Sequence, residues 1–228
     1  MFLDQLVEFL QTQTFLKLFF VFALPFFFPY FFGQISSIIE KLLVNSIGIG
    51  NLSLIDYSRK FSDILNNVLT SVLVTILVPI LSKNFIDKER KVFVNNFFQI
   101  FQMGMIFLSF IIPFFVLNSK IIVNIFFDMG KIDSIRLLEI SNLTVLYGLT
   151  SFSIFFYLIF GMALMTSNNR KKYAFWGIVA QVLAIIMNCS LINYYGIYIF
   201  PVSLFISHLL VGLIMCVSFP FKTKNFNF

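Results

Sequence analysis

Six long apolar stretches, separated by short polar connections, follow one another along the chain from about residue 16 onwards. They cover about residues 16–43, 62–81, 94–117, 137–166, 173–192 and 197–219. Each has roughly the 20 residues or more that an α-helix needs to cross the hydrocarbon of a bilayer. The pattern predicts an all-α integral membrane protein, built as a bundle of about six transmembrane helices.

The two ends of the chain differ from the apolar region between them. Residues 1–14 mix apolar side chains with Asp4 and Glu8, a pattern typical of an amphipathic helix on the membrane surface. They have neither the basic start nor the small-residue cleavage site of a signal peptide, so no cleavage is expected. Residues 15–220 form the predicted six-span bundle, and residues 221–228 a basic cytoplasmic tail.

Polar residues are concentrated in and just before the second apolar stretch. Tyr57-Ser-Arg-Lys60 precedes an apolar helix that contains Asn66, Asn67 and Thr70 and is predicted to stop at Pro79 and Ser82-Lys83. Unsatisfied polar groups are costly in hydrocarbon, so this polar edge is predicted to face other helices or a water-filled cavity. Such a span is typical of a transporter rather than of a passive membrane anchor.

The connection at residues 118–136 is the longest between two apolar stretches. It is too polar and too interrupted to cross a membrane. Its apolar piece, residues 121–127, is predicted to lie at the interface or to continue the third span for a short distance.

Composition supports the membrane assignment. Hydrophobic residues make up 59% of the 228 residues and charged residues only 11%, whereas a soluble domain has about a quarter of its residues charged. The net charge of +6 does not indicate nucleic-acid binding, because the Lys and Arg residues gather in short connections, as membrane topology requires.

The distribution of basic residues predicts the orientation. Residues 83–91, 170–172 and 222–224 are basic and fall on alternate connections, so they are assigned to the cytoplasm together with both termini. The opposite side still has six basic residues, a cluster suited to holding an anion: Lys41, Arg59, Lys60, Lys120, Lys131 and Arg136.

The sequence indicates no enzyme, metal site or cofactor. Cys189 and Cys216 lie inside apolar runs without metal-ligand spacing, and His208 is the single histidine. Asp128 and Asp133 are the nearest approach to an acidic cluster, and they lie in a connection. A membrane-embedded transferase is therefore the least favoured of the hypotheses.

Several segments together resemble the MurJ/MviN lipid II flippases, a family within the multidrug, oligosaccharidyl-lipid and polysaccharide (MOP) exporter superfamily. Tyr57-Ser-Arg-Lys-Phe61, followed by Thr75-Ile-Leu-Val-Pro-Ile-Leu-Ser-Lys83, is similar to the family's Tyr-Ala-Asp/Asn-Arg-Leu and the Pro-x-Leu-Ser ending after it. Phe32-Gly-Gln-Ile-Ser36 and residues 127–133 resemble family segments in the same order. The resemblance runs from about Phe15 and covers the C-terminal six-helix lobe of a family member.

This resemblance implies a function. The chain would be a flippase for lipid II, the lipid-linked cell-wall precursor, or half of one, working by alternating access in peptidoglycan synthesis at the bacterial inner membrane. Its partners would be membrane lipids, the lipid-linked saccharide and a second six-helix lobe, either in a homodimer or as a separate chain. Two alternatives stay open: a flippase for another oligosaccharide-lipid or polysaccharide of the superfamily, and a degenerate half-transporter acting as a membrane scaffold subunit.

The resemblance also implies site residues. Arg59 and Lys60, with Lys41 as a weaker partner, would bind the pyrophosphate, although interfacial anchors would have the same residues. The family's Arg falls on Lys60 and its acidic or amide position on Arg59, and Glu40 is expected to offset the charge of Lys41. Six residues would line the cavity, although hydrogen bonding between helices explains them as well: Gln34, Ser37, Asn67, Thr70, Asn188 and His208. With Asn188 alone in place of the carboxylates of sodium-coupled members, no sodium site is predicted.

Overall fold

Helices make up the secondary structure of the chain wherever it is described. The computed structural model describes residues 2–127 and 132–219, without the side chains of residues 2–22, 25 and 26. The elements are α1 (Phe2–Ile47), α2 (Asn51–Val72), the π-helical η1 (Leu73–Leu77), α3 (Val78–Ile86), α4 (Arg90–Phe127), α5 (Ser134–Thr166), α6 (Arg170–Tyr195), the 3₁₀ turn η2 (Gly196–Tyr198) and α7 (Ile199–Ser218). The prediction of an all-α chain is confirmed.

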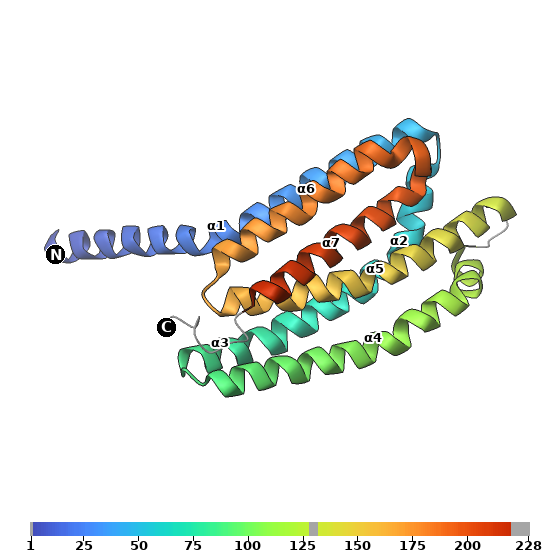
Figure 1. Cartoon of the computed structure of the whole chain (residues 1–228). Coiled ribbons are helices and arrows are strands. Elements are labelled where there is room, and N and C mark those ends of the chain that lie inside the picture. Colours follow the sequence, from blue (N-terminus) through green and yellow to red (C-terminus); the bar gives the residue numbers. More distant parts are fainter. Residues whose placement is uncertain (1, 128–131, 220–228) are drawn as a thin grey trace.

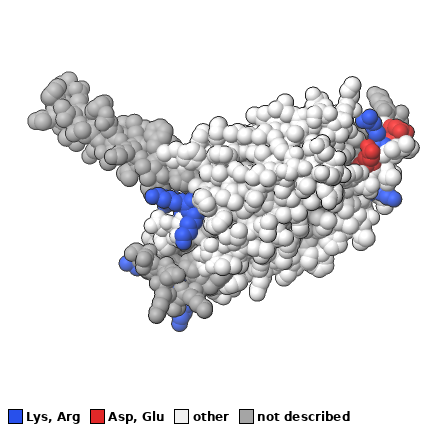
Figure 2. Space-filling view, turned by 45° about the horizontal axis from the view of Figure 1, so that its top comes forward, with Lys and Arg blue, Asp and Glu red and all other residues white. Residues whose placement is uncertain are grey.

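Consecutive helical segments run antiparallel in one bundle, with α2, η1 and α3 joined end to end (Figure 1). The long helix α5 packs against α2, α4 and α7, and α6 packs against α1 and α7. On the face shown in Figure 2, charged side chains lie at the two ends of the molecule and the band between them shows none. Such an apolar band suits the hydrocarbon of a bilayer.

Four segments of the described chain are long and apolar enough to cross a membrane: Asn51–Ile86, Arg90–Phe127, Ser134–Thr166 and Arg170–Ser218. This is fewer than the six predicted. The last segment contains both α6 and α7, which fold back on each other at Gly196, where φ is +56°. The helix α1 is not among the four, and its side chains are described only in part.

The second span does not stop at Pro79 and Ser82-Lys83, as predicted, but continues to Ile86. Proline lacks an N–H, and its ring crowds the carbonyl four residues earlier, so it normally kinks or ends a helix. Here the five residues Leu73–Leu77 before it adopt a π-helical turn. This wider turn relieves the clash and lets the helix continue past the proline.

The helix α4 continues through most of the connection that was predicted to be interrupted. It reaches Phe127, so residues 121–127 continue the third span. Two polar side chains in this region bond to carbonyls one turn earlier: Asn118 Nδ2 donates to Phe114 O at 2.9 Å and Ser119 Oγ donates to Val116 O at 3.3 Å. These two side chains are thus hydrogen-bonded within the helix and do not interrupt it.

No break separates the predicted surface helix, residues 1–14, from the first span, because α1 is continuous from Phe2 to Ile47. The position of residues 1–14 on the membrane surface stays a prediction. The predicted tail, residues 221–228, and the 128–131 part of the motif at residues 127–133 lie outside the described residues.

A glycine allows α7 to approach α5 closely. A Cβ on Gly212 would lie 3.0 Å from the backbone nitrogen of Tyr157 and 3.3 Å from the carbonyl carbon of Phe156. These are main-chain atoms of α5, which cannot turn aside as a flexible side chain does. Small residues permit such close packing between membrane helices.

Replacing Gly212 with Ala is expected to lower the free energy of unfolding by about 1–3 kcal/mol, because α5 and α7 must separate to admit the methyl group. Gly148→Ala is the matched control: its Cβ would meet nothing closer than Phe115 Cβ at 3.9 Å. That variant should be as stable as the wild type. Thermal unfolding of both variants in a mild detergent measures the difference, and equal melting temperatures would disprove the close-packing account.

Candidate functional site

A half-open polar cavity of about 290 Å³ lies between helices of the apolar bundle. One face of α1 and one face of α2 provide most of its lining, each through residues at positions i, i+3, i+4 and i+7, which share one side of a helix. These residues are Gly33, Ser36, Ser37 and Glu40 from α1, and Arg59, Ser62, Asp63 and Asn66 from α2. Tyr147 and Ile154 of α5, Gln181 of α6 and Leu204 of α7 complete the lining.

The strongest interaction in the cavity is the ion pair between Arg59 and Glu40. Arg59 Nη1 lies 3.0 Å from Glu40 Oε1, and Nη2 donates to Oε2 at 3.2 Å, so the pair is bidentate. The guanidinium carbon also lies 5.2 Å from the centre of the Tyr147 ring, within the range of a cation–π interaction. The side chains of Arg59 and Glu40 are 25% and 12% exposed, so the pair is largely shielded from solvent.

Serine hydroxyl groups hold α2 against α5 around this ion pair. Ser58 Oγ donates to Leu54 O at 2.6 Å and lies 3.2 Å from Ile140 O, and Ser62 Oγ donates to Tyr147 O at 2.8 Å. These contacts lie on either side of Arg59 along α2. They set the rotation of the helix that directs the guanidinium into the cavity.

Two polar atoms at the cavity have no hydrogen-bond partner in the described structure. Asn66 donates through Nδ2 to Ser62 Oγ at 3.2 Å, but its Oδ1 is buried and unsatisfied. The hydroxyl group of Tyr147 is likewise buried and unsatisfied. Because buried polar groups are nearly always hydrogen-bonded, both atoms are available to a polar ligand.

Arg59 and Lys60, predicted to act together, point in different directions. Neighbouring residues on an α-helix are about 100° apart. Lys60 is exposed, and its Nζ lies 5.1 Å from the Tyr57 ring centre and 5.9 Å from that of Phe127. Lys41 is also exposed. Of the three predicted pyrophosphate ligands, Arg59 is the one that lines this cavity.

Of the six residues predicted to line a cavity, Ser37 lines this one. Gln34 and Asn67 are exposed, and Thr70 Oγ1 donates to the Asn66 carbonyl at 2.7 Å. Their role in a larger cavity stays a prediction.

Asn188 and His208 are buried between helices. Asn188 Oδ1 accepts a hydrogen bond from Ser203 of α7. His208 Nδ1 lies 3.0 Å from the Leu204 carbonyl, and its ring packs edge-on against the Tyr157 ring. Both side chains therefore contact other residues of the helix bundle. Such contacts were the alternative to cavity lining in the sequence analysis.

Sequence reasoning missed the partnership of Glu40. It assigned Glu40 to the neighbouring Lys41, whereas the structure pairs Glu40 with Arg59. Adjacent residues on a helix do not face each other, so Lys41 is directed away from Glu40. The sequence did contain a signal for this pair. Glu40 lies near the end of the first predicted span and Arg59 just before the start of the second, so both are predicted to lie on the same side of the membrane.

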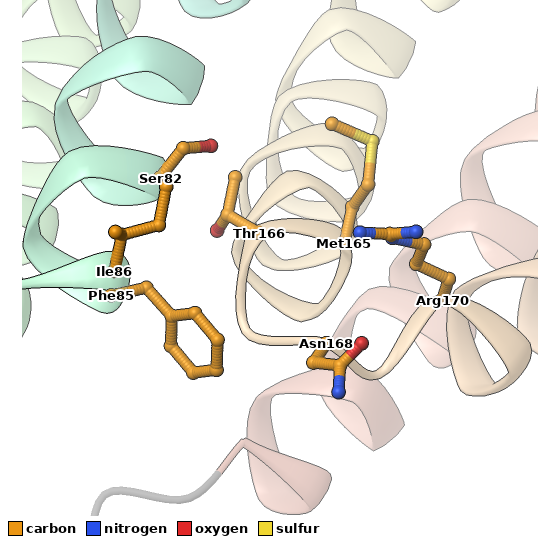
Figure 3. A pocket seen from close by; sticks show the side chains of 7 residues that line it. All are labelled: Ser82, Phe85, Ile86, Met165, Thr166, Asn168 and Arg170. Atoms are coloured by element: carbon orange, nitrogen blue, oxygen red, sulfur yellow. The ribbon is translucent and has the colours of Figure 1, made fainter. Parts of the chain in front are cut away.

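Other cavities of the bundle are lined by described residues. One, of about 390 Å³, lies between α3 and the connection from α5 to α6, where Ser82, Phe85 and Ile86 face Met165, Thr166, Asn168 and Arg170 (Figure 3). Another, of about 420 Å³, has mainly apolar side chains from α4, α5 and α7, among them Leu108, Phe152 and Phe205. The described residues include no group of three or more His, Cys, Asp or Glu placed to hold a metal ion.

The family model of the lipid II flippase MurJ matches residues 5–226. The chain belongs to the MurJ family. This confirms the resemblance found in the sequence and makes the chain a multi-pass membrane protein of a family of transporters rather than of enzymes. No curated protein and no solved structure matches the chain.

Breaking the ion pair should destabilise this MurJ family member. Arg59→Gln or Glu40→Gln alone is expected to cost about 1–3 kcal/mol, less than the loss of a fully buried pair because Arg59 is partly exposed. The double variant should lose less than the sum of the two single losses, because neither charge is left without its partner. Thermal or denaturant unfolding of the four proteins of the cycle gives the coupling energy, and strictly additive losses would contradict the pairing.

Proposed function

We propose that the chain is one lobe of a lipid II flippase, and that Arg59 binds the pyrophosphate of the lipid-linked precursor. The observation that supports this most directly is a guanidinium inside a polar cavity of an apolar bundle. A planar guanidinium donates two parallel hydrogen bonds to phosphate oxygens, and charged groups within a membrane bundle usually mark a substrate pathway.

The size of the cavity supports a small anionic group as its occupant. A volume of about 290 Å³ is just below the roughly 300–1,000 Å³ typical of ligand pockets. Phosphate oxygens fit this space, with the Tyr147 hydroxyl as a further hydrogen-bond donor to the group. The sugar and peptide parts of a lipid II headgroup need space outside this cavity.

A second six-helix lobe would provide that space. Alternating access requires two bundles that move against each other around the bound substrate. We therefore propose that a second lobe, in another copy of the chain or in a separate chain, faces this one across the substrate. Exposed Lys60, Lys41, Gln34 and Asn67 are then candidates for lining the larger cavity between the lobes.

The proposed location is the bacterial inner membrane, with both termini in the cytoplasm. Basic residues in and beside the α3–α4 and α5–α6 connections support this orientation, because both connections lie at the same end of the bundle (Figure 1): Lys83, Lys88, Arg90, Lys91, Arg170, Lys171 and Lys172. A reporter that is active only in the cytoplasm, fused after Phe228, should be active, and an inactive fusion would reverse the orientation.

Arg59→Gln is expected to lower lipid II translocation at least about tenfold, because the anion loses its largely shielded charged partner. Lys60→Gln should lower it about twofold or less, since exposed charges contribute little. Cells depleted of their own flippase and supplied with each variant provide the measurement, as the fraction of lipid II reachable from outside. Arg59→Lys, which keeps the charge but loses the bidentate geometry, should be intermediate.

Equal membrane expression of the variants is the control for this comparison. Wild-type translocation in the Arg59→Gln cells would refute the site assignment. Loss of translocation in Lys60→Gln but not in Arg59→Gln would instead assign the substrate-binding site to the exposed side of α2.

The purified chain is expected to have the mass of at least two six-helix lobes, either as a homodimer or with a co-purified second chain. Native mass spectrometry from a mild detergent distinguishes the two cases. A stable single copy that supports no translocation would favour the scaffold hypothesis instead.

A further inference from the structure

Glu40 binds the same two guanidinium nitrogens of Arg59 that a phosphate group would bind. Both terminal nitrogens of the guanidinium point to the two carboxylate oxygens, at 3.0 and 3.2 Å. Carboxylate and phosphate oxygens bind a guanidinium in the same bidentate geometry. Glu40 and a phosphate group therefore compete for Arg59, and an anion must displace the carboxylate to form the same pair of hydrogen bonds.

No second cation of the described lining is available to Glu40 once it is displaced. The charged or titratable groups at the cavity are Arg59 and Asp63 of α2 and Tyr147 of α5. The residues that α6 and α7 contribute, Gln181 and Leu204, are uncharged. Displacement would leave a carboxylate beside a bound anion and Asp63, with nothing in this lining to balance its charge.

The surroundings of Glu40 then favour its neutral form. The residue is only 9% exposed, and burial without a partner disfavours an ionised carboxyl group. A nearby phosphate adds repulsion between like charges, which acts in the same direction. Protonation of Glu40 removes both penalties and frees Arg59 for the anion.

We infer that Glu40 couples anion binding at Arg59 to the uptake of one proton. The proton comes from water on the side to which the cavity is open, and it returns to water when the anion leaves and the ion pair forms again. Glu40 is thus a positioning residue that acts through Arg59. The inference rests on the proposed function, since it requires that Arg59 bind the pyrophosphate.

The coupling has a defined pH dependence. Over the pH range in which Glu40 is ionised in the free protein and neutral in the complex, the affinity for the anion falls about tenfold for each unit by which the pH rises. The reason is that one proton binds with each anion. Glu40→Gln has neither the competing charge nor the proton to gain. It should bind the anion more tightly than the wild type at neutral pH and lose this part of the pH dependence.

Calorimetric titration of the full chain in lipid nanodiscs with inorganic pyrophosphate tests the inference. Repeating the titration in buffers of different ionisation enthalpy gives the number of protons taken up. The wild type should take up about one proton more than Glu40→Gln. Protonation of the pyrophosphate itself is the same in both titrations, so it cancels in the difference.

Glu139→Gln is the matched control, because Glu139 is a half-buried carboxylate of α5 that is not among the cavity-lining residues. It should retain the proton uptake and the affinity of the wild type. Loss of proton uptake in Glu139→Gln as well as in Glu40→Gln would overturn the assignment to Glu40.

The failures of the two proposals are distinguishable. In one outcome, Arg59→Gln loses pyrophosphate binding, while the wild type and Glu40→Gln bind it with the same affinity and the same proton uptake. This outcome overturns the inference about Glu40 and leaves the proposed function standing. Binding that Arg59→Gln retains, or the absence of binding by the wild type, overturns both.

A measurement on the wild type alone covers the case in which Glu40→Gln does not fold. Infrared difference spectra should show the carbonyl stretch of a protonated carboxylic acid when pyrophosphate is added to the nanodiscs. Absence of this band at saturating pyrophosphate would overturn the inference. Where Glu40→Gln folds, the band should be missing from its spectrum.

Discussion

A charge inside an apolar bundle must have a partner, and the charge of Arg59 is the constraint on which the interior of this protein depends. Hydrocarbon offers no solvation to a guanidinium, so the protein has to supply it. Glu40 from α1 provides the opposite charge, and the Tyr147 ring from α5 lies against the cation. One cationic side chain of α2 thereby joins three helices at one point.

Apolar clusters on both sides enclose this point. Along α2, Leu54 and Ile55 belong to one cluster and Leu69 to the other, with Arg59 and Ser62 between them. The serine hydroxyl contacts from α2 to α5 maintain the rotation of α2, and the close approach of α7 at Gly212 holds α5 from its other side. The polar cavity is therefore a local exception within a bundle that is otherwise assembled by apolar packing.

The same ion pair links the stability of the bundle to its proposed transport function. The bidentate pair joins α1 to α2 at the cavity and stabilises the helices around it. Substrate binding then requires that this pair be exchanged for another of the same geometry. In the proposed mechanism, such an exchange keeps the guanidinium paired throughout and leaves Glu40 as the group whose charge changes. The proposed lobe would then bind its anion only under conditions that allow the carboxylate to be neutralised.

The sequence by itself determined the helical membrane class and the family, because these follow from apolar length, periodicity and short motifs. It also singled out Arg59 as a basic residue in a polar segment. Only the tertiary structure decided that Arg59 faces inward while Lys60 faces outward, that Glu40 pairs with Arg59 rather than with Lys41, and that a π-helical turn allows the helix to pass Pro79. The reason is that these outcomes depend on the rotation of each helix and on contacts between residues far apart in the chain, which local spacing does not encode.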